Sequence, residues 1–185
     1  MLNTPVSFFG KETFEAFELH ADRFGFTWTI VPGHGVPGHF HQDSDEIFEL
    51  ISGTLTFTLN GQKIVASAGE KVHVPKQAVH SVFNKTKENA VCKVYYTPAS
   101  DQDKFMRAAQ FLVQQDAGMQ GKLGLIIRAL YMTSKLGYKE FSTPGSAATR
   151  IPTNMFFGIV MLWGNLGGWM KQTKAFAGAL KSGQV

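Results

Sequence analysis

The sequence predicts a mainly β fold, an antiparallel barrel or sandwich, followed by a segment of α-helices. Short runs of alternating apolar and polar residues, separated by turn residues, extend from about residue 11 to residue 97. Beyond Pro98 the apolar residues recur at helical spacing instead. Because the chain has 185 residues, of which 44% are hydrophobic, it can form one domain with its own core and an appendage. We therefore expect a β domain over residues 1–100 and a helical extension over residues 101–185.

The clearest β-strand covers residues 54–59. Its sequence, Thr-Leu-Thr-Phe-Thr-Leu, places three large apolar side chains on one face and three threonines on the other. It runs directly into Asn60-Gly61, the strongest short signal for a hairpin turn, so the partner strand is expected over residues 62–66. Further strands are expected over residues 12–20, 25–31, 71–74, 79–83 and 90–96. Many short strands at this spacing are typical of a sandwich or a barrel.

Two helices are expected between residues 100 and 134. Ser100 is followed three residues later by Asp103, an approximate capping signal, and the apolar residues after it repeat at helical spacing through Gln115. The second helix should cover residues 121–134. Its buried side is expected to carry Leu123, Ile126, Ile127, Leu130 and Tyr131.

The last part of the chain is expected to be a loop followed by one long helix. Residues 137–151 are predicted as the loop. The third helix should begin near Pro152, because proline is favoured in a first helical turn, and run towards Lys174 with strain at its glycines. Its stretch 155–163 is apolar on all sides, so we expect it to pack against the β domain or a second subunit, with contact to a membrane surface as the alternative. The longer apolar run over residues 155–170 is interrupted by Asn165 and several glycines, and it falls short of the roughly 20 apolar residues that a membrane-spanning helix needs.

Charge and cysteine content narrow the class of protein. The net charge is +4, and it is unevenly distributed: residues 1–100 hold eight Lys and Arg against ten Asp and Glu, whereas residues 101–185 hold ten against four. These basic residues are scattered and no nucleic-acid-binding motif accompanies them, so we expect a solvated face and no nucleic-acid partner. The single cysteine, Cys92, cannot form an intrachain disulfide, and residues 1–6 lack the pattern of a signal peptide. We therefore expect a cytoplasmic protein with a buried thiol.

Three of the six histidines lie where a metal site would need them. His39 and His41 are two residues apart, so on a strand both imidazoles point to the same face. A turn follows, and then a strand that opens with Glu46. Glu46 shares its parity with the apolar residues of that strand and should face the interior, whereas Glu49 should face outward. A carboxylate on an interior face is costly unless it is paired or bound to a cation, so its position favours a metal.

The third histidine of the set is His80. It lies on the predicted strand 79–83, on the same face as Val82, whereas His73 lies off the face of its apolar neighbours and is expected on the exterior. Three imidazole nitrogens and one carboxylate oxygen suit a borderline divalent ion such as iron, manganese, nickel, zinc or copper, and they leave positions open for water or substrate. These donors do not select one of the ions.

The spacing of these residues resembles the motifs of the cupin superfamily. The first cupin motif is a glycine, a His-x-His pair, a glutamate and a second glycine, and it is matched in residue type and spacing at Gly33, His39, His41, Glu46 and Gly53. The resemblance implies a small single-domain cupin, an antiparallel barrel of the jelly-roll type, over roughly residues 20–97, with a helical C-terminal extension.

The second cupin motif is matched at Gly69, Pro75, His80 and Asn84. It departs at Gln77, where the family usually has glycine. Glycine serves a backbone conformation there that costs a residue with a side chain about 1 kcal/mol. Because this departure concerns the turn and not the metal donors, we expect the turn to persist.

By this resemblance, His39, His41, Glu46 and His80 would bind one divalent metal ion, and the chain would form a homodimer. The function expected first is a metal-dependent enzyme on a small organic molecule, a dioxygenase of the quercetin-cleaving kind, in which Glu46 doubles as a catalytic base. The alternatives are a cupin isomerase or decarboxylase that uses the metal as a Lewis acid, and a non-catalytic cupin that binds a small ligand. Phenylalanines on the strands are expected in the core or around the pocket, and an apolar pocket would favour an aromatic or otherwise apolar ligand.

Overall fold

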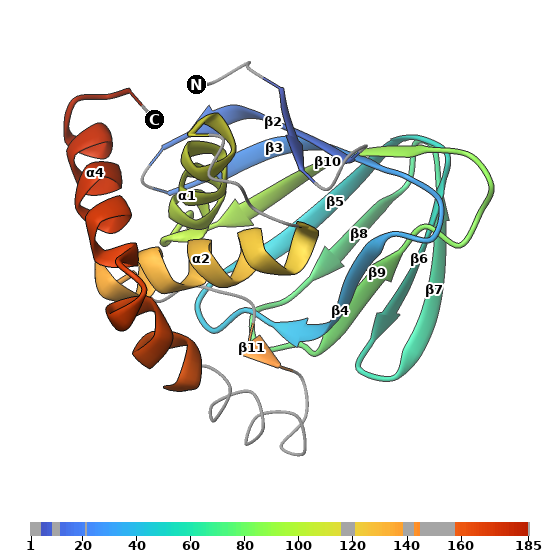
Figure 1. The fold of residues 1–185 in the computed structure, drawn as a ribbon. Coiled ribbons are helices and arrows are strands. Elements are labelled where there is room, and N and C mark those ends of the chain that lie inside the picture. The colour runs from blue at the N-terminus through green and yellow to red at the C-terminus, as the bar shows by residue number, and fades with distance from the viewer. Residues whose placement is uncertain are drawn as a thin grey trace. The chain divides into compact units, whose positions relative to one another are not determined.

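Two antiparallel β-sheets build the first part of the chain in a computed structural model of the protein (Figure 1). The structure describes residues 5–8, 12–20, 22–115, 121–138, 143–144 and 158–184. One sheet has the strand order β1-β2-β3-β10-β5-β8, and the other has the order β11-β4-β9-β6-β7. The strands are β1 (Val6–Phe8), β2 (Glu12–Leu19), β3 (Phe24–Ile30), β4 (Gly35–Phe40), β5 (Asp45–Ser52), β6 (Thr54–Leu59), β7 (Gln62–Ser67), β8 (Lys71–Val74), β9 (His80–Phe83), β10 (Ala90–Thr97) and β11 (Thr143–Pro144).

Apolar side chains of alternating parity fill the space between the two sheets. Trp28 and Ile30 on β3 are buried, as are Leu55 and Phe57 on β6. The rings of Phe48 on β5 and Phe57 on β6 meet edge to face with their centroids 5.0 Å apart, so they join the two sheets. The mainly β jelly-roll barrel predicted from the sequence, with helices after it, is confirmed.

The predicted strands agree with the observed ones to within one residue at each end. The hairpin between β6 and β7 shows why: Asn60 has a φ of 48° and Gly61 a φ of 84°. Positive φ at both central residues is the conformation that matches the twist of the flanking strands, and Asn-Gly adopts it at little cost. The register then follows, with Leu59 opposite Gln62 and Thr54 opposite Ser67.

Helices form the second part of the described chain. They are α1 (Gln102–Gln114), α2 (Gly121–Lys135), residues 158–166 and α4 (Trp169–Lys181). Phe111 on α1 and Phe176 on α4 have ring centroids 5.6 Å apart, and the rings of Tyr131 on α2 and Trp169 on α4 meet edge to face at 5.4 Å. Aromatic packing therefore joins α4 to both α1 and α2.

The prediction of one long third helix is wrong. Residues 158–166 are helical, but Gly167 and Gly168 form a turn that separates them from α4. Gly168 has a φ of 77°, the left-handed conformation that ends a right-handed helix. The glycines thus terminate the helix and do not merely strain it. The start expected near Pro152 lies outside the described residues.

The predicted start of the first helix is also wrong by one residue. Ser100 has a φ of 47° and lies outside the helix, whose N-cap is Asp101. The Ser100 hydroxyl instead accepts a hydrogen bond from Ser44 Oγ at 3.3 Å. A capping signal read from residue types alone cannot include such a long-range partner.

The buried side of α2 differs from the predicted one. Tyr131 is fully buried as predicted, but Ile126, Ile127 and Leu130 are only partly buried, and the side chain of Leu123 lies outside the described ones. The buried residues are Leu125, Ala129, Tyr131, Met132 and Thr133. Because this helix is apolar over most of its circumference, its sequence pattern alone does not select the buried face.

The segment 137–151, predicted as a loop, contributes the short strand β11. Thr143 pairs with Phe40 and Pro144 pairs with His39 on β4. A two-residue strand carries no periodic signal, so only the tertiary structure can assign it. The loop residues 139–142 and 145–151 lie outside the described part of the chain.

The chain divides into two compact units. One comprises residues 2–100 with 142–150, and the other comprises residues 101–141 with 151–185. We propose that residues 1–100 and 101–185 are the two domains, with residues 142–150 of the second belonging to the first unit. Within the described ranges, no helix is long and apolar enough to cross a membrane.

Candidate metal centre

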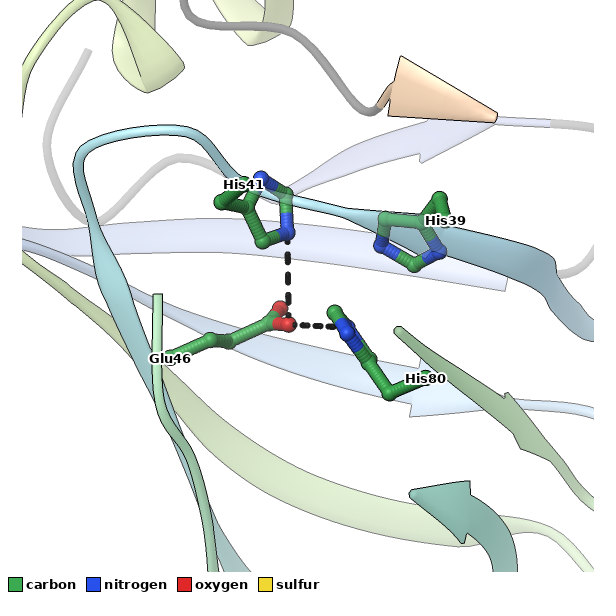
Figure 2. Close-up of side chains that lie close together, drawn as sticks. All are labelled: His39, His41, Glu46 and His80. Atoms are coloured by element: carbon green, nitrogen blue, oxygen red, sulfur yellow. Dashed lines mark hydrogen bonds and ion pairs between the residues drawn. The ribbon is translucent and has the colours of Figure 1, made fainter. Parts of the chain in front are cut away.

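Four buried side chains of the barrel converge on one point between the sheets (Figure 2). His39 lies near the end of β4 and His41 directly follows that strand, Glu46 is the second residue of β5, and His80 opens β9. Each is at most 6% exposed. The register of β4 and β9 places His39 directly opposite His80, so the fold itself brings these two imidazoles together.

The donor atoms of this cluster are close enough to share one ion. One nitrogen from each histidine and one carboxylate oxygen of Glu46 all lie within 4.8 Å of one another. Glu46 Oε2 lies 2.8 Å from Nε2 of His80 and 3.4 Å from Nε2 of His41. The ring centroids of His39 and His80 are 4.1 Å apart.

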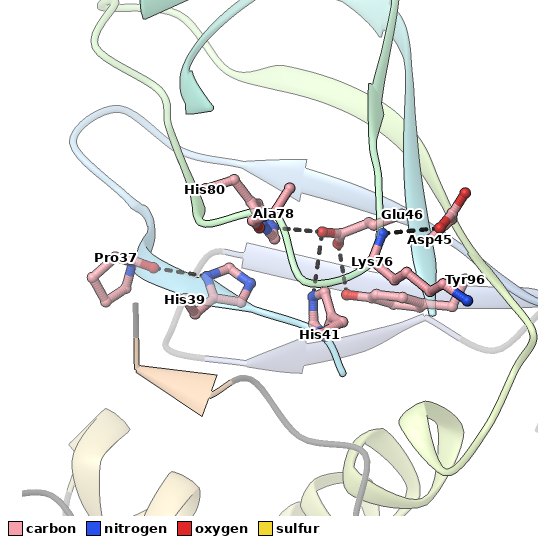
Figure 3. A network of polar contacts seen from close by, with 9 residues as sticks. All are labelled: Pro37, His39, His41, Asp45, Glu46, Lys76, Ala78, His80 and Tyr96. Carbon is pink, nitrogen blue, oxygen red and sulfur yellow. Dashed lines mark hydrogen bonds and ion pairs between the residues drawn. The ribbon is translucent and has the colours of Figure 1, made fainter. Parts of the chain in front are cut away.

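Backbone carbonyls orient two of the three imidazoles (Figure 3). His39 Nδ1 lies 2.8 Å from the carbonyl oxygen of Pro37, and His80 Nδ1 lies 3.1 Å from that of Ala78. An Nδ1–H that donates to a carbonyl leaves Nε2 as the nitrogen available to a metal. In both residues the carbonyl belongs to the residue two positions earlier, so the local backbone fixes the ring.

Burial and contacts within the cluster shift the pKa values of its side chains. Burial and the neighbouring His80 lower the pKa of His39 to about 4, so this imidazole is neutral at physiological pH. Burial alone would raise the pKa of Glu46, but hydrogen bonds and charges from His41 and His80 outweigh it and hold that pKa well below its usual range. Burial opposes ionisation of His80 as well, yet the hydrogen bond and charge of Glu46 raise its pKa.

These donors fit a divalent transition-metal ion. His80 Nε2 and Glu46 Oε2 lie 2.8 Å apart, and a metal ion held by both would take the place of a proton between them. Three nitrogens and one carboxylate oxygen in a buried, low-dielectric environment match borderline divalent ions. The cluster could therefore bind such an ion, as the sequence predicts, and the donors favour no single metal.

Comparison with known proteins assigns the barrel to a family. The cupin domain family matches residues 26–96. The barrel is a cupin domain. It resembles the solved structure of KdgF from Halomonas sp., with a TM-score of 0.50 and 16% sequence identity, over 54% of this chain and 92% of that one.

A second solved structure shows the same fold. An RmlC-like cupin from Shewanella frigidimarina matches with a TM-score of 0.50 and 14% identity, over 55% of this chain and 88% of that one. At such identities both likenesses establish the fold alone. No curated protein sequence matches the chain.

The unusual turn of the second cupin motif persists, as expected. Gln77 has a φ of 64°, the left-handed conformation that glycine usually supplies there. Its backbone N–H donates to the carbonyl oxygen of His41 at 2.7 Å. The turn therefore holds the backbone of a candidate ligand, which explains why it tolerates the strain of a side chain at this position.

The remaining residue of that motif, Asn84, is structural. It is fully buried, and its amide donates to the carbonyl oxygens of Ile30 at 2.8 Å and Glu88 at 2.7 Å. The bond to Glu88 closes the polar loop between β9 and β10, and the bond to Ile30 connects this loop to the end of β3. Asn84 thus satisfies buried backbone groups.

Alternation along the strands also separates the buried candidate ligands from exposed residues correctly. His73 is on the exterior, with its side chain 56% exposed and Nε2 2.9 Å from Asp45 Oδ2. Glu49 accepts a hydrogen bond from Lys71 Nζ at 2.7 Å on the outer face of β5. His34 lies 3.2 Å from the buried Glu12.

One residue of the site was not predicted from the sequence. The Tyr96 hydroxyl donates a 2.6 Å hydrogen bond to Glu46 Oε1, and its ring lies 5.0 Å from that of His41 (Figure 3). Burial and the charge of Glu46 raise the pKa of Tyr96 well above its usual value, so the hydroxyl keeps its proton. The alternation of side chains along β10 could have placed Tyr96 in the interior, because Tyr96 shares a face with the buried Cys92.

Proposed function

We propose that this cupin is a metal-dependent enzyme that acts on a small organic molecule, a dioxygenase of the quercetin-cleaving kind. The observation that carries the proposal is the buried cluster of three imidazoles and one carboxylate, whose donor atoms lie within 4.8 Å of one another. Buried ionisable groups cost stability unless they are compensated, and clusters of this kind concentrate at functional sites.

The chain's own residues have separate roles in this proposal. His39, His41, Glu46 and His80 would hold the ion. A divalent transition-metal ion bound there supplies Lewis acidity to a substrate oxygen and, where it is redox-active, a route for electrons to dioxygen, both atoms of which enter the products. The carbonyls of Pro37 and Ala78 keep two of the imidazoles in a fixed orientation.

Glu46 is the proposed proton acceptor. Burial alone would raise its pKa, but hydrogen bonds and charges from His41 and His80 hold that pKa well below its usual range, so the carboxylate is ionised and can accept a proton.

The surroundings of the cluster support an aromatic substrate. Tyr96 packs against Phe24 and Phe26, with ring centroids 6.3 Å and 6.2 Å away, on the same side as His41. Within the described residues no lysine or arginine is buried, so no permanent cation inside the barrel would pair with a phosphate or a carboxylate. An apolar ligand with a few oxygens fits these walls better than a strongly anionic one.

Metal binding is the first test. Elemental analysis and calorimetric titration should give about one divalent ion per chain, and His39→Ala and His80→Ala should each weaken binding at least tenfold because a donor is lost. His73→Ala removes an exposed imidazole on the neighbouring outer face and should leave the affinity unchanged. Equal effects of His73→Ala and His80→Ala would contradict the proposed ligand set.

Oxygen consumption is the second test. The metal-loaded protein should consume dioxygen when flavonoids or simpler phenols are supplied, and Glu46→Gln should abolish turnover whereas Glu49→Gln should not. Turnover of a substrate without oxygen uptake, under every metal tried, would point to the Lewis-acid isomerase or decarboxylase. Binding of the phenol without any turnover would point to a ligand-binding cupin.

A further inference from the structure

Tyr96 and Glu46 face each other across two hydrogen-bonded strands. The register of β5 and β10 makes them direct partners, although they are 50 residues apart in the chain. Directly opposed residues on one face of an antiparallel pair have neighbouring side chains. The contact between these two side chains is therefore set by the fold.

The two oxygens of the Glu46 carboxylate have different partners. Oε1 accepts the Tyr96 hydroxyl at 2.6 Å, whereas Oε2 faces Nε2 of His80 at 2.8 Å and Nε2 of His41 at 3.4 Å (Figure 3). A short hydrogen bond to a carboxylate is of the stronger, charge-assisted kind. It fixes the rotation of the carboxylate and directs one oxygen to the imidazoles.

We propose that Tyr96 is a positioning residue that commits Glu46 to bind metal through Oε2 alone. This inference rests on the proposed metal function and deepens it. With Oε1 held by the tyrosine, Glu46 occupies one coordination position and not two, which leaves more of the ion's positions open to substrate. Partners that orient a ligand in this way commonly change metal affinity ten- to a hundredfold when they are removed.

The aromatic ring of Tyr96 has a separate, structural role. It stacks beside Phe24 and Phe26 on the neighbouring strand β3. Tyr96→Phe keeps this ring and deletes only the hydroxyl, so it isolates the hydrogen bond from the packing.

The adjacent tyrosine provides a matched control. Tyr95 points to the opposite face of β10, where its hydroxyl lies 3.4 Å from Oε2 of Glu49, the outward-facing carboxylate of β5. Tyr95→Phe therefore also removes a tyrosine–glutamate contact between the same two strands. It does so on the face away from the metal donors.

The test is a titration of the metal-free full chain with Co²⁺, followed by visible absorption and calorimetry. We expect Tyr96→Phe to weaken Co²⁺ binding about ten- to a hundredfold and to change the ligand-field bands, because a released carboxylate can bind through both oxygens. We expect Tyr95→Phe to match the wild-type affinity and spectrum. Unchanged affinity and bands in Tyr96→Phe would overturn the inference while leaving the metal function standing.

Infrared spectroscopy tests the wild-type protein directly. With glutamate labelled by ¹³C, the splitting between the antisymmetric and symmetric carboxylate bands separates one-oxygen from two-oxygen ligation. We expect the one-oxygen pattern in the Co²⁺-loaded wild type, and a two-oxygen pattern there would overturn the inference even if Tyr96→Phe failed to fold. Failure of the wild type to bind Co²⁺ would instead overturn the metal function and, with it, this role of Tyr96.

Discussion

His39 and His80 lie side by side in the barrel, but their environments shift their pKa values in opposite directions. Burial lowers the pKa of His39 to about 4, whereas the carboxylate of Glu46 raises that of His80. The two imidazoles therefore differ in their affinity for protons. A metal ion that binds His80 competes with its proton, so metal binding should weaken as the pH falls.

The neutral state of His39 predicts how the stability of the metal-free protein depends on pH. Because the unfolded chain protonates this imidazole near pH 6.5 and the folded chain only near pH 4, the unfolded state binds more protons between these values. The free energy of unfolding should therefore fall as the pH is lowered through this window. Glu46, whose pKa is lowered by folding, reduces the free energy of unfolding only as the pH falls below its ordinary pKa of 4.5. His80, whose pKa is raised by folding, stabilises the protein at low pH, and this stabilisation is lost only as the pH rises above 6.5.

Urea unfolding at pH 6.5 and pH 4.5 would measure this effect. The metal-free wild type should lose about 2 kcal/mol more than His39→Asn between these two values, since a tenfold difference in proton affinity between the folded and unfolded states corresponds to about 1.4 kcal/mol. Parallel losses in the two proteins would show that His39 is not buried in its neutral form.

At the scale of elements, the junction between β5 and β6 depends on one glycine of the first cupin motif. Gly53 has a φ of 74°, and a Cβ added there would lie 2.6 Å from the carbonyl oxygen of Asn89 and 2.8 Å from the Cα of Ala90. The requirement is thus both conformational and steric. Gly69 in the second motif has a similar φ of 87°, but nothing lies within 4 Å of its added Cβ.

This difference predicts unequal effects of the same substitution. Gly69→Ala should lower the free energy of unfolding by about 1 kcal/mol, the cost of a left-handed alanine. Gly53→Ala should lower it by roughly 3 kcal/mol, because the backbone of the segment at Asn89 and Ala90 must also move. Chemical denaturation of both variants would measure the difference. Equal losses would mean that the backbone at Asn89 and Ala90 can move without a cost in free energy.

Local sequence signals predicted one turn of this protein correctly and missed another. Asn60-Gly61 gave a correct hairpin because the turn conformation depends on these two residues alone. The break at Gly167 and Gly168 was missed because glycines inside an apolar run can either strain a helix or end it. Gly168 is the residue that adopts the left-handed conformation and ends it.

At the scale of the whole molecule, the helical unit exposes an apolar stripe. Ile159, Leu162, Trp163 and Leu166 are 57, 58, 71 and 78% exposed, and their spacing places them on one face of the helix over residues 158–166. Val160 on the other side of the same helix is buried. Of the stretch 155–163, which the sequence predicts to be apolar on all sides, residues 155–157 lie outside the described part of the chain. In the described helix the exposed apolar side chains lie on one face, for which we propose a second copy of the chain as the partner.

A homodimer through this stripe would be isologous, with the same side chains on both copies. Light scattering should give twice the chain mass for the wild type, and Leu162→Lys with Leu166→Lys should give the single-chain mass because two buried charges would face each other. Lys174→Gln on the exposed side of α4 should leave the mass unchanged. A single-chain mass for the wild type would contradict the proposed dimer.

The sequence by itself determined most strands of the barrel, though not β1 or β11, and which side chains of the predicted strands face its interior. Parity selected Glu46 over Glu49 and His80 over His73, and the burial of both selected residues agrees with it. This was possible because side chains alternate strictly along a strand, so local order in the chain fixes the face.

The tertiary structure alone decided which interior side chains meet. The pairing of Tyr96 with Glu46, the strand β11 beside His39 and the exposed stripe of residues 158–166 depend on contacts between segments distant in the chain. Alternation assigns a residue to a face but not to a partner, because strand order and register are set by packing of the whole barrel. The sequence therefore supplied the candidate ligands, and the register supplied the residue that orients one of them.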